Sequence, residues 1–233
     1  VEYEVSQPLP PEEGHGPMRL SLGFGSRSGS EYTSIGIRPA NHSLMDPDEG
    51  YLPGAGISFL DTEIRYGQAD NKLVLQRLAI VEINSISQRS DFFKPVSWRF
   101  VAGLEREEIA RKAHRTDLAF RGGPGIAYGF GSDGLVYAFV EPEVRFADGL
   151  DKGYAAGIGG SAGVLKPVMA GWKAGIEARS SAFVIGDSYS AASVVFKQRF
   201  TLDRSNALMV DIKKVRFDGY WSTEFSAGLN RYF

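Results

Sequence analysis

The stretch Leu135-Val-Tyr-Ala-Phe-Val-Glu-Pro-Glu-Val-Arg-Phe146 decides the fold, because apolar and polar side chains alternate along it with a period of two. The apolar series is Val136, Ala138, Val140, Val144 and Phe146, and the polar series is Tyr137, Glu141, Glu143 and Arg145. Such alternation predicts a strand with one apolar and one polar face. Similar stretches begin at Trp172 and Ala192.

Twelve runs of this kind follow one another along the chain, each about ten residues long and separated by turn residues. They begin at Met18, Glu31, Gly56, Lys72, Val96, Asp117, Leu135, Tyr154, Trp172, Tyr189, Asn206 and Tyr220. An even number of strands can close without an edge, as a bilayer demands. The sequence therefore predicts an all-β fold, a closed antiparallel transmembrane β-barrel of twelve strands.

Two stretches are less regular. Leu73, Leu75, Leu78 and Ile80 share one face only if a β-bulge lies near Arg77. The segment from Glu105 to His114 is short and highly charged, and we interpret it as part of a loop.

The polar face identifies the inside of the barrel, because glycines and opposite charges dominate it rather than the mixture typical of a solvated surface. Small and paired charged residues suit a narrow lumen. The predicted lumen network comprises Arg99, Glu105, Arg121, Glu141, Arg145, Glu177, Arg179, Lys197, Arg199, Asp211, Lys213 and Glu224. The apolar face carries aromatic residues near its ends, namely Trp98, Tyr128, Tyr154, Trp172, Trp221 and Phe233. This is the lipid-facing pattern of barrels in the bacterial outer membrane.

Composition excludes several classes of protein. A formal charge of −2 argues against a nucleic-acid-coating protein, and the lack of cysteine excludes thiolate metal sites and cysteine nucleophiles. The mean hydropathy of −0.17 is compatible with a barrel, because only one face of each strand is apolar. The three histidines, His15, His42 and His114, are far apart in the sequence, so we expect no metal site and no cofactor.

The two ends of the chain differ in character. Residues 1–17 are rich in proline and predict a linker or periplasmic extension, and residues 18–233 form the predicted barrel. The final strand ends on an aromatic residue. Its Ser226, Gly228 and Phe233 resemble the recognition segment of bacterial outer-membrane barrels, which implies insertion by the barrel-assembly machinery.

An even strand count places both chain ends on the periplasmic side, together with the long connections Ala40–Ala55 and Ser87–Pro95. These loops predict either a docking surface for a periplasmic partner or a plug of the lumen. The docking residues would be His42, Asp46, Asp48, Glu49, Tyr51, Phe92 and Phe93. At the outer rim, cations could bind lipopolysaccharide phosphates or form a solvated charged loop. The rim cations are Arg106, Arg111, Lys112, Arg115, Lys214 and Arg216.

The sequence also resembles a bacterial family. The run from Arg38 to Ala55, the Leu60-Asp61 pair and the run from Phe92 to Trp98 are similar to the C-terminal region of uncharacterised proteins with an Lnb-type, papain-like N-terminal periplasmic domain. The resemblance implies that this chain is the outer-membrane barrel portion. It implies no activity of the barrel itself.

We therefore expect a non-enzymatic barrel that serves as membrane anchor and periplasmic docking platform, with outer-membrane lipid and lipopolysaccharide as its surroundings. The first alternative is a narrow channel for small solutes. The second is a lipid hydrolase that uses Asn41, His42 and Ser43. Adjacent side chains point in diverging directions, whereas a catalytic triad needs hydrogen-bonded geometry.

Overall fold

The computed structural model describes Pro10 and residues 13–233, so most of the predicted linker lies outside the described residues. Twelve long strands form the wall, and two short strands, β3 (Ala40–His42) and β6 (Gln88–Arg89), lie at one end of it. The wall strands are β1 (Arg19–Arg27), β2 (Ser30–Arg38), β4 (Ala55–Gly67), β5 (Lys72–Ser85), β7 (Ser97–Ala110), β8 (Ala113–Phe130), β9 (Gly134–Phe146), β10 (Tyr154–Met169), β11 (Trp172–Gly186), β12 (Tyr189–Asp203), β13 (Asn206–Phe217) and β14 (Tyr220–Tyr232). Within the described ranges, no helix is long and apolar enough to cross a membrane.

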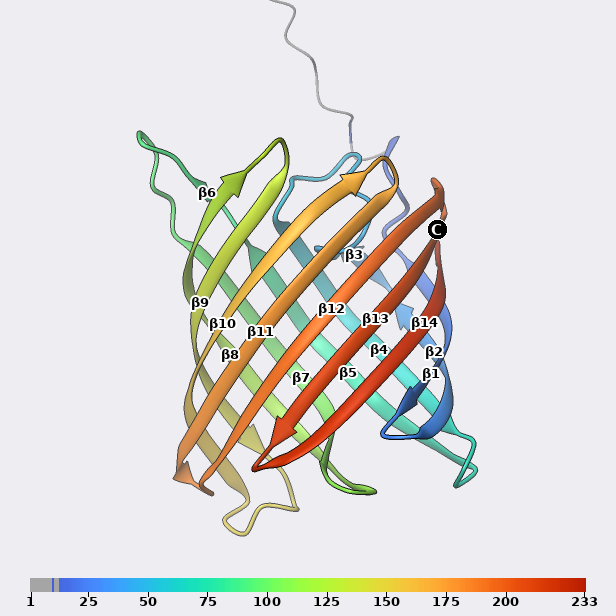
Figure 1. Cartoon of the computed structure of the whole chain (residues 1–233), viewed down its shortest axis with the longest axis vertical. Coiled ribbons are helices and arrows are strands. Elements are labelled where there is room, and N and C mark those ends of the chain that lie inside the picture. Colours follow the sequence, from blue (N-terminus) through green and yellow to red (C-terminus); the bar gives the residue numbers. More distant parts are fainter. Residues whose placement is uncertain (1–9, 11–12) are drawn as a thin grey trace, which may run out of the picture.

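The wall strands form one closed antiparallel barrel, which confirms the predicted fold (Figure 1). Each wall strand pairs with the next along the chain, and β14 pairs with β1 from Arg19↔Tyr232 to Arg27↔Glu224. Met18 and Phe233 exchange backbone hydrogen bonds of 3.3 and 2.9 Å, so the residue before β1 lies beside the residue after β14. We call this end of the barrel the terminal end and the opposite end the far end.

The two faces of the wall differ as the alternation predicts. Large apolar side chains are exposed on the outside, as at Phe24, Ile158 and Val184, the last with 72% of its surface exposed. Charged side chains such as Glu141 and Arg145 are buried on the inside. The barrel thus offers an apolar surface to lipid and keeps its charges in the lumen.

Irregularities occur along the wall, and those in β4 and β5 affect the reading of the sequence most. The register between β4 and β5 shifts so that Gln76 has no partner, which places a bulge beside Arg77 as the sequence predicts. A second irregularity leaves Leu60 unpaired opposite β5 with a φ of +52°. These bulges break the alternation of apolar and polar residues.

The expected loop between the fifth and sixth strands is wrong. β7 continues to Ala110 and β8 begins at Ala113, so residues 105–110 are strand. The charges of this segment are not those of a solvated loop, because Glu105 faces the lumen and accepts a hydrogen bond of 2.7 Å from Arg121.

The long connection between β3 and β4 turns into the terminal end of the barrel. We call residues 43–54 the mouth loop. Its Met45 packs inside the wall in a buried apolar cluster with Ile86, Tyr137 and Leu165. The loop therefore fills the terminal mouth of the lumen.

Candidate functional site

The lumen encloses a cavity of about 500 Å³ between the wall and the mouth loop. Leu44 and Met45 of the mouth loop line it on the terminal side. Of the described side chains that line it, ten are basic and nine are acidic. The basic ones are Arg19, Arg27, Arg65, Arg77, Arg99, Arg106, Arg121, Arg179, Lys197 and Lys213, and the acidic ones are Asp46, Asp61, Glu63, Glu82, Glu105, Glu107, Glu177, Asp211 and Glu224.

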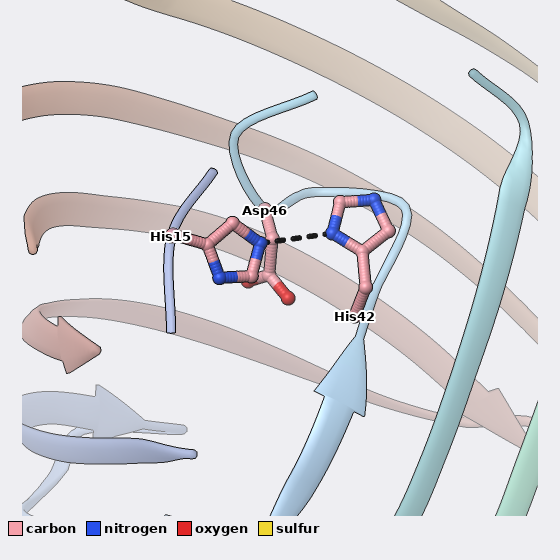
Figure 2. A group of neighbouring side chains, drawn as sticks. All are labelled: His15, His42 and Asp46. Carbon is pink, nitrogen blue, oxygen red and sulfur yellow. Dashed lines mark hydrogen bonds between the residues drawn. The ribbon is translucent and has the colours of Figure 1, made fainter. Parts of the chain in front are cut away.

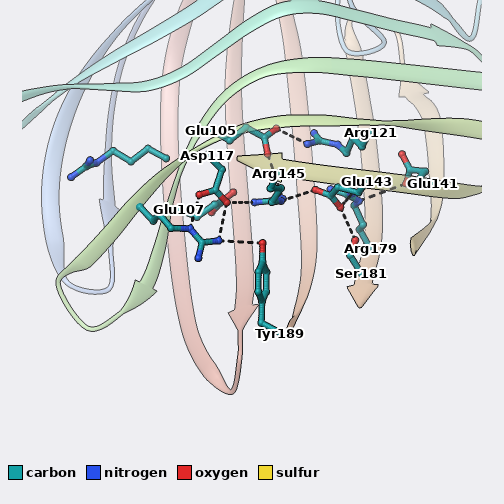
Figure 3. A network of polar contacts seen from close by, with 12 residues as sticks. Glu105, Glu107, Asp117, Arg121, Glu141, Glu143, Arg145, Arg179, Ser181 and Tyr189 are labelled. Carbon is teal, nitrogen blue, oxygen red and sulfur yellow. Dashed lines mark hydrogen bonds and ion pairs between the residues drawn. The ribbon is translucent and has the colours of Figure 1, made fainter. Parts of the chain in front are cut away.

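A dense network of ion pairs crosses the far half of the lumen, and we call it the far network (Figure 3). Its buried centre is Glu143, which accepts hydrogen bonds from Arg145 Nε at 2.7 Å, from Arg179 and from Ser181 Oγ at 3.0 Å. Arg145 also donates from Nη1 to Asp117 at 3.0 Å. Every one of these side chains comes from a wall strand, so the network narrows the lumen without a loop.

Arg99 forms a second group in the middle of the lumen. Its Nη1 and Nη2 donate to the two carboxylate oxygens of Glu177 at 3.1 and 2.9 Å, and its guanidinium lies 4.2 Å from the ring centre of Phe139. The Tyr137 hydroxyl donates to the same carboxylate at 2.8 Å. This two-pronged geometry holds Arg99 in one orientation.

Glu141 is fully buried and lies 3.8 Å from Arg99 and 3.6 Å from Arg179. Neither of its carboxylate oxygens has a hydrogen-bond partner within the described part of the chain. Electrostatic attraction to two guanidinium groups therefore holds this charge in place.

A third group lies against β1, β2 and β4. Glu224 accepts hydrogen bonds from Arg27 Nε at 2.6 Å and from the Tyr32 hydroxyl at 2.7 Å, and it forms an ion pair with Arg65 at 2.7 Å. Asp61 bridges Arg19 and Arg77 in the same way. Of these residues the sequence predicts Glu224 and Arg19 on the inner face, whereas the bulges in β4 and β5 obscure which face Arg65 and Arg77 occupy.

Three predicted members of the lumen network have no ion pair within 4.0 Å among the described residues, namely Lys197, Arg199 and Asp211. Lys197 and Asp211 are register partners on β12 and β13, and both line the cavity. Lys213 lies 3.6 Å from Glu107. Lys197 therefore presents a charge to the cavity that no carboxylate of the described residues meets within 4.0 Å.

The mouth loop is held by ion pairs as well as by its apolar cluster. Asp48 accepts a hydrogen bond of 2.6 Å from the buried Lys173 of β11. Asp46 lies 2.6 Å from the fully buried Arg38. The prediction that His42 and Asp46 form an external docking surface is wrong, because both side chains are buried inside the terminal mouth. Of the two roles predicted for the loop, the geometry is that of a plug.

His15, His42 and Asp46 form a buried group beneath the mouth loop (Figure 2). His15 Nε2 lies 3.0 Å from His42 Nδ1, and the Tyr51 ring stacks on the His42 ring at 4.2 Å. Burial lowers the pKa of His42 to about 4, so its ring is neutral at pH 7. Burial alone would raise the pKa of Asp46, but the Arg38 guanidinium outweighs this effect and holds it well below its usual value. The expectation that the histidines lie far apart is wrong for this pair, because the chain folds back on itself.

The candidate triad is not assembled. Among the described contacts, no hydrogen bond joins His42 to Ser43; the Ser43 backbone N–H instead donates to Asp46 at 2.7 Å. The side chain of Asn41 lies outside the described residues. The geometry offers no activated nucleophile at this position.

Of the predicted rim cations, Arg106 and Arg115 face the inside of the barrel and the other four are exposed. Arg115 is buried and donates to Asp117 at 2.6 Å, so its place on the outer rim is wrong. The cause is the extension of β8 to Ala113, which turns Arg115 toward the lumen with Asp117. Arg106 lines the cavity. Exposed side chains near the far end remain at Arg111, Lys112, Lys214 and Arg216.

Other predicted residues lie at the terminal end. Phe92 is fully exposed and Phe93 is 71% exposed, whereas Glu49 is an exposed polar residue of the mouth loop. Ser226 and Gly228 line the cavity, and Phe233 is exposed beside the start of β1.

A family model described as "Domain of unknown function (DUF7840)" matches residues 8–232. A search of the curated proteins found no match. Many solved structures share the fold, and three of them illustrate the similarity. The "KdgM porin in complex with disordered oligogalacturonate" has a TM-score of 0.53 and 11% identity and covers 92% of this chain and 99% of its own. The NanC porin has the same values, and the "COG4313 outer membrane channel from Pseudomonas putida F1" has a TM-score of 0.54 and 8% identity over the whole of both chains.

These similarities are to outer-membrane barrels, and at such low identity they establish the fold alone. Together with the exposed apolar band and the closed wall of twelve strands, they place the barrel in the bacterial outer membrane, as the sequence predicts.

Proposed function

The chain belongs to the DUF7840 family, and we propose that it is a narrow outer-membrane channel for small solutes. The observation that carries this proposal is the cavity of about 500 Å³ inside the wall, lined by charged side chains from most of the wall strands. A barrel that acted only as an anchor could fill its interior with packed apolar side chains. Charged groups around a cavity in a membrane barrel are instead typical of an aqueous path.

The balance of charges in the cavity bears on the class of solute. One protein of similar fold is described in complex with an oligogalacturonate, which is a polyanion. In this chain the lumen cations are mostly paired with carboxylates, as Arg99 is with Glu177 and Arg121 with Glu105. A nearly neutral, internally paired lining favours small ions and zwitterions over a long polyanion. We therefore expect weak selectivity between cations and anions.

The mouth loop sets the size of what can pass. It fills the terminal mouth with Met45 and is tied to the wall through Asp48 and Lys173. The channel is then either narrow while the loop is docked or wider when the loop leaves the mouth. Destabilising the docked loop should therefore raise the mean conductance, because the wider state becomes more populated.

Planar-bilayer recording of the purified barrel tests the proposal. The chain contains no cysteine, so a single introduced cysteine is the only target for a thiol reagent. Lys197→Cys places the thiol on the cavity wall, and a bulky charged reagent should reduce the unitary conductance. Val184→Cys is the matched control, because Val184 is exposed on the lipid side and its modification should leave the conductance unchanged.

The expected result is stable unitary steps that the reagent blocks in Lys197→Cys alone. A correctly folded barrel that shows no unitary steps contradicts the proposal. Equal block of both cysteine variants also contradicts it, because the current would then not pass through the lumen.

A second proposal follows from one feature of the terminal end. Phe92 and Phe93 lie fully or largely exposed in the connection between β5 and β7, and Leu52 is 76% exposed on the mouth loop. Exposed aromatic and aliphatic side chains of this kind are typical of an interaction site. The resemblance to Lnb-type proteins suggests a papain-like periplasmic domain as the partner, which the barrel would anchor to the membrane.

Photo-crosslinking in cells tests this second function. A benzophenone amino acid at position 92 should cross-link to a papain-like periplasmic domain, whether that domain is on the same polypeptide or on another. The same amino acid at position 184 should not, because Val184 is on the lipid side of the wall. Cross-links from position 92 to lipid alone contradict the docking role.

A further inference from the structure

The group of His15, His42 and Asp46 has the composition and spacing of a metal site (Figure 2). All three side chains are buried, and their ligand atoms lie within 4.8 Å of one another. Two imidazole nitrogens at Zn–N distances of 2.0–2.1 Å are about 3.3 Å apart in a tetrahedral site. His15 Nε2 and His42 Nδ1 are 3.0 Å apart, so they need to separate by only a few tenths of an ångström to hold an ion.

The protonation of His15 is already that of a metal ligand. Its Nδ1 lies 2.7 Å from the backbone carbonyl oxygen of Gly16, and because a carbonyl can only accept, Nδ1 must carry the proton. The lone pair is therefore on Nε2, which faces His42. Metal-binding histidines commonly donate their second nitrogen to a backbone carbonyl in this way.

The surroundings hold both rings in place. The Tyr51 ring stacks on both imidazoles, with ring centres 4.7 Å apart for His15 and 4.2 Å for His42. The Tyr232 ring is tilted against His15, with ring centres 4.6 Å apart. Gly16 passes so close to the end of β14 that an added Cβ would lie 1.9 Å from the Phe233 carbonyl oxygen. Only glycine fits there, and this close passage brings His15 into the mouth.

Asp46 supplies the negative charge that the two neutral rings lack. Its Oδ1 accepts one hydrogen bond, from the Tyr232 hydroxyl at 2.8 Å, and a carboxylate oxygen has room for a second partner. Its Oδ2 accepts from the Ser43 backbone N–H at 2.7 Å and lies 2.6 Å from Arg38. An ion would share this carboxylate with Arg38 and with Arg19, whose Nη1 lies 4.0 Å from Oδ1, so we expect weaker binding than in a fully dedicated structural zinc site.

We propose that His15, His42 and Asp46 bind one Zn²⁺ ion, which fastens the segment that enters the barrel to the mouth loop. Two imidazoles and a carboxylate are borderline ligands that suit zinc, and they leave a fourth position for water. When the ion binds, the hydrogen bond between the rings is lost and the proton on His42 Nδ1 moves to Nε2 through solvent. The ion would thereby strengthen the plug, whether or not the lumen conducts.

Zinc titration of the full chain folded in detergent micelles tests the site. After treatment with EDTA, ZnCl₂ is added in competition with a chromophoric chelator. We expect one ion per chain, and a loss of affinity of about tenfold or more in His15→Gln and in His42→Gln, since even outer-sphere changes cost about 10–100-fold. His114→Gln is the matched control, because His114 is exposed at the far end, and its affinity should equal that of the wild type.

A spectroscopic measurement on the unaltered protein removes any dependence on how the variants fold. Co²⁺ in place of Zn²⁺ should give the intense visible bands of a four-coordinate site, and added Zn²⁺ should abolish them. Weak octahedral bands, or no binding in competition with the chelator, overturn the proposal. So does an unchanged zinc affinity in both His15→Gln and His42→Gln, with folding checked by heat-modifiable gel migration.

Discussion

The two ends of the lumen are narrowed by different means. At the far end, side chains rooted in the wall meet across the interior, as Arg145 does with Glu143 and Asp117. At the terminal end, a separate loop turns inward and rests on an apolar cluster around Met45. The constriction at the far end is part of the barrel wall, whereas the constriction at the terminal end is an added segment.

This difference has a physical consequence. Buried charges lose their solvation when the barrel folds, so each one depends on its partners, and removal of one partner leaves the others unpaired. The mouth loop, by contrast, can leave the lumen while every wall strand keeps its hydrogen-bonded neighbours. Damage at the far end should therefore appear in the stability of the whole barrel, and damage at the terminal end should appear in the opening of the mouth.

The largest effect is expected from Glu143→Gln in the far network. The substitution keeps the shape of the side chain but removes the charge that faces Arg145 and Arg179. Breaking a buried pair typically costs about 3–5 kcal/mol, and we expect a loss of this size in the free energy of unfolding. Reversible urea unfolding in lipid vesicles measures it.

The control for this prediction is Glu31→Gln, because Glu31 is exposed next to the turn between β1 and β2. Its free energy of unfolding should change by less than about 0.5 kcal/mol. Similar losses in both variants would mean that the far network is solvated, and the contrast between the two ends would disappear.

Much of this architecture follows from alternation, and its failures have definite causes. The faces of Glu141 and Arg145 are readable because period two fixes which side of the wall each residue occupies. The prediction of a loop over the segment from Glu105 to Ala110 is wrong, because a strand whose charges face a lumen has the same composition as a solvated loop. Arg65 and Arg77 are missed because bulges shift the phase between neighbouring strands.

The mouth loop and the contact between His15 and His42, by contrast, do not follow from the alternation of apolar and polar residues. His15, His42 and Tyr232 meet only because the chain end, a short strand and the last wall strand converge at one mouth. No periodic pattern describes the path of a loop, so the spacing in the sequence says nothing about this contact. The tight passage of Gly16 beside Phe233, which brings His15 into the mouth, also exists only in the folded chain and leaves no periodic signal in the sequence.

The next largest effect is expected from Met45→Ala in the mouth loop. Truncating a buried methionine costs about 2–5 kcal/mol, but part of this loss falls on docking of the loop rather than on the wall. We therefore expect a higher mean conductance in planar bilayers and a fall of about 2 kcal/mol or less in the free energy of unfolding. Leu52→Ala, an exposed position of the same loop, should change neither quantity. A fall in unfolding stability as large as that of Glu143→Gln would show that the loop is part of the wall's cooperative unit.

A smaller effect is expected from Asp48→Asn, which weakens the tie between the mouth loop and Lys173. A hydrogen bond to a charged group contributes about 1.5–3 kcal/mol, and asparagine retains part of it, so we expect the loop to open about tenfold more often. Limited proteolysis of the folded barrel measures this opening as a faster cut within residues 43–54. Asp133→Asn, in an exposed turn at the same end, should leave the cutting rate unchanged. Equal protection of Asp48→Asn and wild type would assign the docking of the loop to the apolar cluster alone.

The smallest effect on stability is expected on the outside of the far end, in the double variant Lys214→Gln/Arg216→Gln. Lys214 lies 5.0 Å from the Trp221 ring centre, a contact that contributes about 0.5–1 kcal/mol. We propose that these exposed cations bind lipopolysaccharide phosphates, so the variant should bind lipopolysaccharide more weakly and with a reduced dependence on salt. The matched control, Lys94→Gln/Arg231→Gln, removes the same charge at the terminal end, where Arg231 likewise lies over Phe233 at 5.4 Å. Both double variants lose one cation–π contact and two charges, so their free energies of unfolding should be equal. Only the far-end variant should have a lower affinity for lipopolysaccharide. An equal fall in affinity for lipopolysaccharide in both variants would show that the attraction depends on the overall charge and that the far end has no special role in it.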